Sequence, residues 1–222
     1  MLVSELQKLL SGLYRLEMHA DINDFLVTDR LFLEDAVADA TPVADEMLLI
    51  RESDDDTDDQ LDVALYIDEN MLDRLVDADP RTNLHARNLN DFCTVLEGVS
   101  HFVYLVWNAV QDKQITQLEL ELQAEIDKYI GTRLLLESQT NAELADNVLS
   151  ALFESVTFRA DLPQERLDRY KQANNIASRY CYYLQQRFPQ SRISASMMDE
   201  LRYFYRMPQT DKLSHMQSAQ FS

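Results

Sequence analysis

Residues 90–111 constrain the fold of this chain more than any other stretch, because apolar side chains cover most of the circumference of the helix that they predict. These apolar positions are Phe92, Val95, Leu96, Val99, Phe102, Val103, Val106, Trp107 and Val110. A helix this apolar must lie inside the protein. We therefore expect a buried central helix around which the rest of the chain packs.

One strip of this helix is polar. It consists of Asn90, Cys93, Glu97, His101, Tyr104 and Asn108, which follow at steps of three or four residues and so share one face. Burying a carboxylate and an imidazole is costly unless the two are paired. The sequence favours an internal network in which Glu97 pairs with His101, and the tyrosine and asparagine further along the strip are tied to that pair.

The alternative is a metal-binding or acid/base site on the same strip. Glu97 and His101, four residues apart, would supply two ligands. The set would be completed by Tyr104, Glu121 and Glu125, the last two from the next predicted helix. Carboxylate-bridged di-metal bundles use Glu-x-x-His twice, and this motif does not occur in the chain. The metal site is therefore the second interpretation, and no cofactor is predicted.

The net charge of −19 is concentrated in the N-terminal third. Residues 1–83 hold 22 acidic and 6 basic side chains, whereas residues 84–222 hold 17 and 14. Such a surface repels phosphate backbones and anionic lipids, so we expect neither direct nucleic-acid binding nor membrane binding. The longest nearly uncharged apolar run, residues 99–110, is also shorter than the roughly 20 residues that span a bilayer. The natural complement of this charge is a protein partner with a basic surface.

Charge and composition together favour a non-enzymatic interaction protein, such as an adaptor, an accessory subunit or a chaperone-like binder. Its acidic docking residues would be Asp54, Asp55, Asp56, Asp58 and Asp59. A second contact face, for a partner or for self-association into a homo-oligomer, would comprise Arg202, Tyr203, Tyr205 and Arg206. Tyrosine and arginine are enriched at protein interfaces, which is why these residues are chosen. A third hypothesis is an acidic mimic of nucleic acid.

Other chemistries find little support. The aspartates from Asp54 resemble half of a calcium loop, but Asp59 stands where glycine is required and Leu65 where the closing glutamate is required. No phosphate-binding glycine motif or nucleophile elbow is present. Cys93 and Cys181 lie in apolar helical context and predict buried free thiols. With no export signal at the start, a cytoplasmic location is expected.

The predicted fold is mainly α: a single-domain helical bundle around the buried central helix, with a small N-terminal antiparallel β-hairpin. We divide it into an acidic helix and hairpin region (residues 1–80), the bundle (81–207) and a polar C-terminal tail (208–222). The hairpin strands are predicted over residues 47–51 and 61–67. Helices are predicted over residues 3–19, 29–38, 69–76, 90–111, 117–133, 141–155, 163–188 and 196–206.

Overall fold

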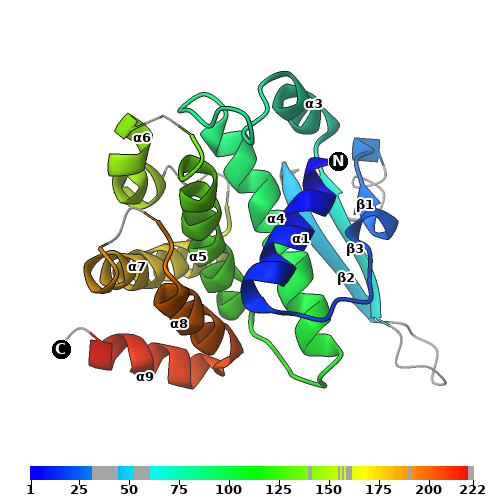
Figure 1. Cartoon of the computed structure of the whole chain (residues 1–222). Helices are drawn as coiled ribbons and strands as arrows, with labels where there is room; N and C mark the ends of the chain where they lie inside the picture. The colour runs from blue at the N-terminus through cyan, green and yellow to red at the C-terminus, as the bar shows by residue number, and fades with distance from the viewer. Residues whose placement is uncertain are drawn as a thin grey trace.

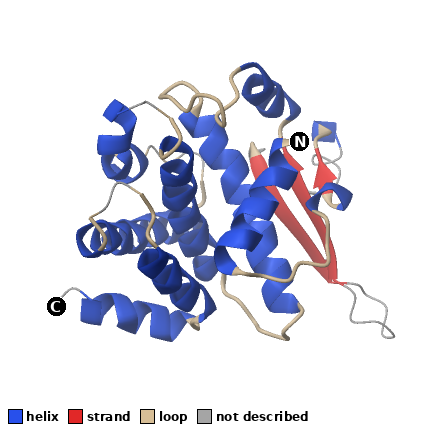
Figure 2. Cartoon of the chain, viewed as in Figure 1, coloured by secondary structure: helices blue, strands red, loops and turns tan. Residues whose placement is uncertain are grey.

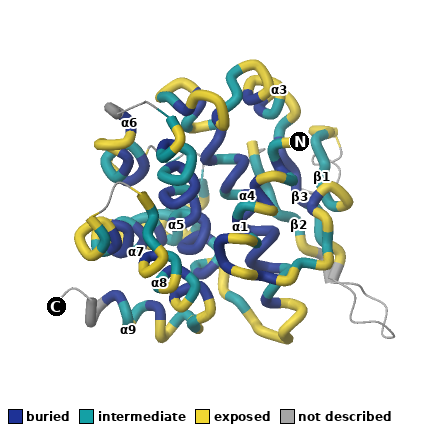
Figure 3. Tube along the Cα trace, in the orientation of Figure 1, coloured by how far each residue is buried: buried dark blue, intermediate teal, exposed yellow. Residues whose placement is uncertain are grey.

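Helix α4 (Leu89–Ala109) runs through the centre of the molecule, with the other helices and a small sheet around it (Figure 1). The computed structural model describes residues 1–31, 45–52, 61–139, 142–154, 156, 158, 162–189 and 192–219. Over these residues the chain is a mainly α single domain with a three-stranded sheet. Most of α4 is buried, as Figure 3 shows, so the predicted central helix is confirmed.

The sheet packs against one side of α4 (Figure 2). Strands β2 (Glu46–Glu52) and β3 (Leu61–Ile67) pair antiparallel, which confirms the predicted hairpin. A third strand, β1 (Leu26–Val27), pairs in parallel with the other edge of β3. The sequence does not predict β1, because two residues are too few to show an alternating pattern.

Gly98 allows the sheet to approach α4 closely. A methyl group at this position would lie 2.7 Å from Cγ of Glu46 and 3.1 Å from Cδ1 of Leu65. Real side chains do not tolerate the first of these distances, so only glycine fits here without a shift of the Glu46 side chain. The close approach places Glu46, the first residue of β2, directly against α4.

Helix α5 (Gln117–Leu136) packs against α4 on one side and α7 (Gln164–Arg187) on another. The chain leaves α4 through Asp112, which has a φ of 53°, and Thr116 with Glu119 forms a capping box at the start of α5. A methyl group at Gly131 would lie 2.5 Å from Cδ2 of Leu96, so α4 and α5 also meet at a glycine. The predicted break between the two helices is confirmed.

Helix α1 (Leu2–Tyr14) packs on α4 and ends at Arg15, which has a φ of 52°, before the predicted end at residue 19. Its last carbonyls are held from the far end of the chain by α8 (Ala195–Arg206). Nε of Arg202 donates to the carbonyl of Leu13 and Nη2 of Arg206 to that of Tyr14, both at 2.8 Å. Cations placed at a helix C-terminus satisfy its free carbonyls and oppose its dipole.

The remaining helices follow the predicted order with two differences. Helix α3 (Glu69–Asp77) forms where it was predicted and is capped by Asp68, and α7 begins directly after Pro163, as expected. The helix predicted over residues 141–155 is instead a short helix, α6 (Ala142–Asp146), and a separate π-helical turn, η2 (Ser150–Glu154). A 3-10 turn, η1 (Ile22–Asp24), precedes the sheet.

The predicted polar tail is wrong over residues 209–219, which form helix α9 (Gln209–Ala219). The segment is polar in composition, yet it buries Lys212 and Met216 against the bundle. One lysine and one methionine four residues apart are too weak a pattern to predict a packed helix. Most of the helix predicted over residues 29–38, the aspartates at positions 54–59, and Thr140 lie outside the described residues.

Candidate functional site

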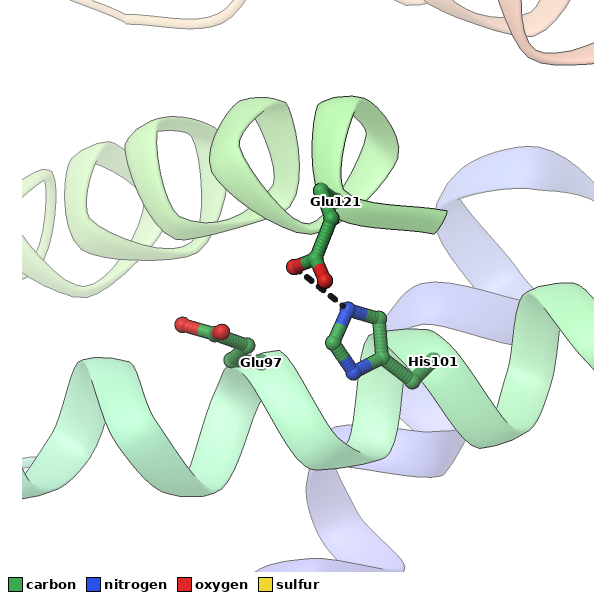
Figure 4. A group of neighbouring side chains, drawn as sticks. All are labelled: Glu97, His101 and Glu121. Atoms are coloured by element: carbon green, nitrogen blue, oxygen red, sulfur yellow. Dashed lines mark ion pairs between the residues drawn. The ribbon is translucent and has the colours of Figure 1, made fainter. Parts of the chain in front are cut away.

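His101 of α4 lies within a cluster of charged side chains contributed by α4, α5, α7 and β2. Its Nδ1 is 3.3 Å from Oε1 of Glu46. Its Nε2 is 3.5 Å from Oε2 of Glu121, a contact that Figure 4 marks with a dashed line. The second contact is an ion pair without hydrogen-bond geometry, and among the described residues this buried Nε2 has no hydrogen-bond partner. The side chain is only 9% exposed. A buried donor without a partner is costly, so this atom requires an explanation.

Glu97, His101 and Glu121 together form a possible ligand set. Each offers one ligand atom, and these atoms lie within 4.8 Å of one another. Figure 4 shows Glu97 and His101 on the side of α4 that faces α5, with the Glu121 carboxylate opposite the imidazole. Ligands of one tetrahedral zinc ion at about 2.0–2.1 Å lie about 3.3 Å apart. The distances between these ligand atoms therefore need to shorten by up to about 1.5 Å, which rotation of the flexible carboxylate side chains provides.

Glu46 occupies the position of an outer partner for His101. Metal-binding histidines commonly give one ring nitrogen to the metal and the other to a carboxylate, which fixes the orientation of the ring. Here Nδ1 contacts Glu46, and Nε2 points toward the two remaining carboxylates. The close approach at Gly98 is what brings Glu46 within reach.

Lys128 of α5 holds two carboxylates of the cluster. Its Nζ is 2.9 Å from Oε2 of Glu97 and 2.8 Å from Oε1 of Glu125. The network interpretation paired Glu97 with His101, but Glu97 instead pairs with Lys128. Glu125, which was a candidate ligand, lies on the far side of this lysine and is not part of the ligand set.

Helix α7 adds two guanidinium groups. Nε of Arg169 is 3.8 Å from Oε1 of Glu121, too far for a hydrogen bond, and among the described residues it has no hydrogen-bond partner. Nε of Arg166 donates to the hydroxyl of Tyr170 at 2.9 Å, and its charge acts on Glu97. The cluster thus brings together both signs of charge.

Burial and charge oppose each other in this cluster. Burial disfavours the charged imidazole, but the carboxylates of Glu121 and Glu46 outweigh it and raise the pKa of His101 well above its usual value. Burial likewise opposes ionisation of Glu97, but Lys128 and His101 lower its pKa. Burial raises the pKa of Glu46 and that of Glu125. His101 without a bound ion is therefore an imidazolium.

Tyr104, the remaining candidate ligand, belongs to a second buried network between α4, α5 and α9. Its hydroxyl accepts from Nζ of Lys212 at 3.0 Å, and that lysine also contacts Oε1 of Gln123 at 3.4 Å. Asp127 is the centre of this network and accepts hydrogen bonds from Tyr14, Ser100 and Gln123. Tyr104 is therefore not placed to act with His101.

The predicted partner-binding face at the C-terminal end is divided by the structure. Tyr203 is 62% exposed, whereas Tyr205 is 2% exposed and stacks on Tyr14 in the core. Arg202 and Arg206 are engaged with α1, as described above. Of these four residues, Tyr203 and Arg206 are exposed, and the guanidinium of Arg206 already donates to α1.

Four residues of the cluster were not candidates from the sequence: Glu46, Lys128, Arg166 and Arg169. A signal for Lys128 exists, because Glu121, Glu125 and Lys128 stand at helical spacing on one face of α5. Glu46 carries no such signal, since it reaches α4 from a strand 55 residues away.

A cavity of about 590 Å³ lies elsewhere, between α5, α6 and the end of α7. Its lining includes Tyr129, Arg133, Glu137, Phe188 and Arg192, and none of the cluster residues. The lining of the cavity contains both acidic and basic side chains. The carboxylate of Glu137 already accepts a hydrogen bond from the backbone N–H of Ile193. The chemistry of the cluster therefore does not depend on this cavity.

Comparison with models of protein families, with curated proteins and with solved structures finds no match. Among the described helices, none combines the length and the apolar character needed to cross a membrane.

Proposed function

We propose that this protein binds one divalent transition-metal ion through Glu97, His101 and Glu121. The observation that carries the proposal is the buried Nε2 of His101, which has no hydrogen-bond partner among the described residues and faces Glu121, with Glu97 in the same ligand set. Imidazole with carboxylates suits zinc, iron and manganese rather than calcium or magnesium. Three protein ligands leave at least one coordination position open, which is typical of a reactive metal site rather than a structural one.

The surroundings of the ligand set support the same proposal. Ligating side chains in metal sites are held by outer partners, and loss of one such partner typically weakens metal binding 10- to 100-fold. Glu46 plays this part for His101, and Lys128 plays it for Glu97. Without a metal, the proton on His101 offsets the charge of the two nearest carboxylates. Metal and proton therefore compete for one nitrogen.

Titration of the EDTA-treated protein with Zn²⁺ and Co²⁺, followed by calorimetry, tests the proposal. We expect one ion per chain, release of a proton on binding, and tighter binding as the pH rises, because His101 must lose its proton. His101→Gln and Glu121→Gln should weaken binding by about 100-fold or more. Glu125→Gln is the matched control, since Glu125 touches the same lysine but is outside the ligand set.

Two outcomes of these titrations would contradict the metal proposal. If no ion binds stoichiometrically up to pH 8, or if His101→Gln binds as tightly as the original chain, the cluster is an internal ion network and the metal proposal is wrong. Circular dichroism of each variant shows whether the fold survives the substitution.

The charge distribution favours a second candidate function, the cytoplasmic interaction protein inferred from the sequence. Its support is the excess of acidic side chains in residues 1–83 and the exposure of Tyr203. Cys93 and Cys181 are both buried and free, as a reducing compartment favours. Homo-oligomer formation remains part of this candidate.

Capture of partners at low and high salt tests this second candidate. We expect a basic protein to be retained at low salt and lost when Asp54, Asp55, Asp56, Asp58 and Asp59 are all replaced by Asn. Equal capture by the substituted chain contradicts an acidic docking patch. A captured protein that releases its DNA would instead support the nucleic-acid mimic.

A further inference from the structure

The cluster around the ligand set contains charged side chains of both signs. The described residues of the cluster provide four carboxylates: Glu46, Glu97, Glu121 and Glu125. They provide three permanent cations: Lys128, Arg166 and Arg169.

Metal binding changes the charge of this cluster. A divalent ion brings two positive charges and requires neutral His101, so the loaded cluster carries one positive charge more than the metal-free cluster with its imidazolium. In a partly buried site an uncompensated charge is costly, and an anion from solution removes it. The metal also retains an open coordination position.

Arg169 shows where such an anion would be held. Its Nε is buried, lies 3.8 Å from the nearest oxygen of Glu121, and has no hydrogen-bond partner among the described residues. When the metal draws Glu121 toward His101, this donor remains unsatisfied. Guanidinium groups recognise carboxylate and phosphate oxygens through charge-assisted hydrogen bonds.

From these observations, and resting on the proposed metal function, we infer that the loaded site binds a small oxyanion, with one oxygen on the metal and another on the guanidinium of Arg169. Carboxylate and phosphate groups share this chemistry. Arg166, one helical turn earlier on α7, adds a second positive charge on the same side. The substrate class of the site is thus an anion whose oxyanion group reaches the metal.

The Co²⁺-loaded protein tests this inference, because the visible spectrum of Co²⁺ changes when its coordination changes. Acetate and inorganic phosphate are titrated separately, and acetamide serves as the uncharged control. We expect saturable spectral change with at least one of the two anions and none with acetamide. Which of the two binds more tightly distinguishes a carboxylate from a phosphate ligand.

Arg169→Gln should weaken anion binding about 10- to 100-fold, the worth of one hydrogen bond to a charged group, while the variant still takes up one Co²⁺ at saturating metal. Arg187→Gln is the matched control, because Arg187 lies on the same helix with an exposed side chain away from the cluster.

The outcomes separate the two proposals. Failure to take up Co²⁺ overturns the metal function and this inference with it. Uptake of Co²⁺ with no response to either anion, or an equal response to acetamide, overturns the inference alone. Unchanged anion affinity in Arg169→Gln overturns the role of Arg169.

Discussion

Glu46 determines the charge state of His101, although the two residues are 55 positions apart in the sequence. In the metal-free protein, Glu46→Gln keeps the shape of the side chain and an acceptor for Nδ1 but removes the negative charge. We expect the pKa of His101 to fall, because one of the two carboxylates that raise it is gone. NMR titration of the imidazole measures this. Glu69→Gln, an exposed position in α3, is the control.

The same residue gives a pH dependence of stability. His101 binds its proton more tightly in the folded chain than in the unfolded chain, where its pKa is about 6.5. Its contribution to the free energy of unfolding is therefore complete below about pH 6.5 and is lost as the pH rises through the folded-state pKa. In Glu46→Gln this loss should occur at lower pH. An imidazole pKa that does not move in Glu46→Gln would contradict the arrangement described here.

At the level of whole elements, alanine substitutions at three glycines test how closely the helices and the sheet pack. Gly98→Ala and Gly131→Ala place a methyl group against Glu46 and Leu96, and we expect each to lower the free energy of unfolding by about 1–3 kcal/mol through overpacking. Gly12 in α1 has no atom within 4 Å of the added methyl group. Gly12→Ala should therefore raise stability by about 0.5–1 kcal/mol, the helix-propensity gain.

Urea unfolding of the three alanine variants provides the comparison. A loss of stability in Gly12→Ala would contradict the open space at Gly12, and a gain in Gly98→Ala or Gly131→Ala would show that the contacts at that glycine are looser than described. Gly98→Ala should also weaken the contact between Glu46 and His101 and thus lower the pKa of His101.

Helix α9 is attached through a buried lysine, and this makes its docking depend on pH. Lys212 is fully buried, and burial lowers its pKa to about 8 from an ordinary 10.5. The unfolded chain binds more protons between these values, so the free energy of unfolding should rise by about 3 kcal/mol from pH 8 to pH 10.5. In Lys212→Met this rise should be absent.

For each variant, the free energy of unfolding is subtracted from that of the original chain at the same pH, because tyrosines also titrate at alkaline pH. Lys113→Met, at an exposed lysine that lies 5.0 Å from the ring centre of Trp107, should keep the rise. The same pH slope in Lys212→Met as in the original chain contradicts the burial of the ammonium group.

Over the whole molecule, helix α1 near the start of the chain contacts helix α8 near its end. Tyr14 of α1 stacks on Tyr205 of α8 with ring centres 4.0 Å apart, and the arginines of α8 hold the end of α1. We therefore expect thermal unfolding in one cooperative step, with the same midpoint by far-ultraviolet circular dichroism and by fluorescence of Trp107. Two separate transitions would indicate that residues 1–80 fold independently of the bundle.

Much of the fold could be predicted, because its strongest elements carry local signals. The apolar circumference of α4, the capping box at Thr116 and the alternation in β3 each depend on residues close in sequence. Helix α9 carries no such signal, since the described residues that it buries are one lysine, which reaches Tyr104 on α4, and one methionine. The strand β1 is likewise defined only by its pairing with β3.

In the candidate site, too, only the residues with a local sequence signal could be predicted. Glu97, His101 and Glu121 could be chosen because helical spacing places them on facing surfaces of two consecutive helices. The partner of Glu97 could not, because the choice between His101 and Lys128 depends on how α5 is rotated against α4. Glu46 and Arg169 come from elements whose position no local pattern gives.

The arginine contacts between α8 and α1 affect how this protein is made. Arg206 follows Tyr14 by 192 residues. On a ribosome that adds about 5–20 residues per second, the first helix emerges roughly 10–40 s before the arginine that completes it. During that interval α1 can pack on α4, but its last carbonyls lack the guanidinium partners that α8 supplies.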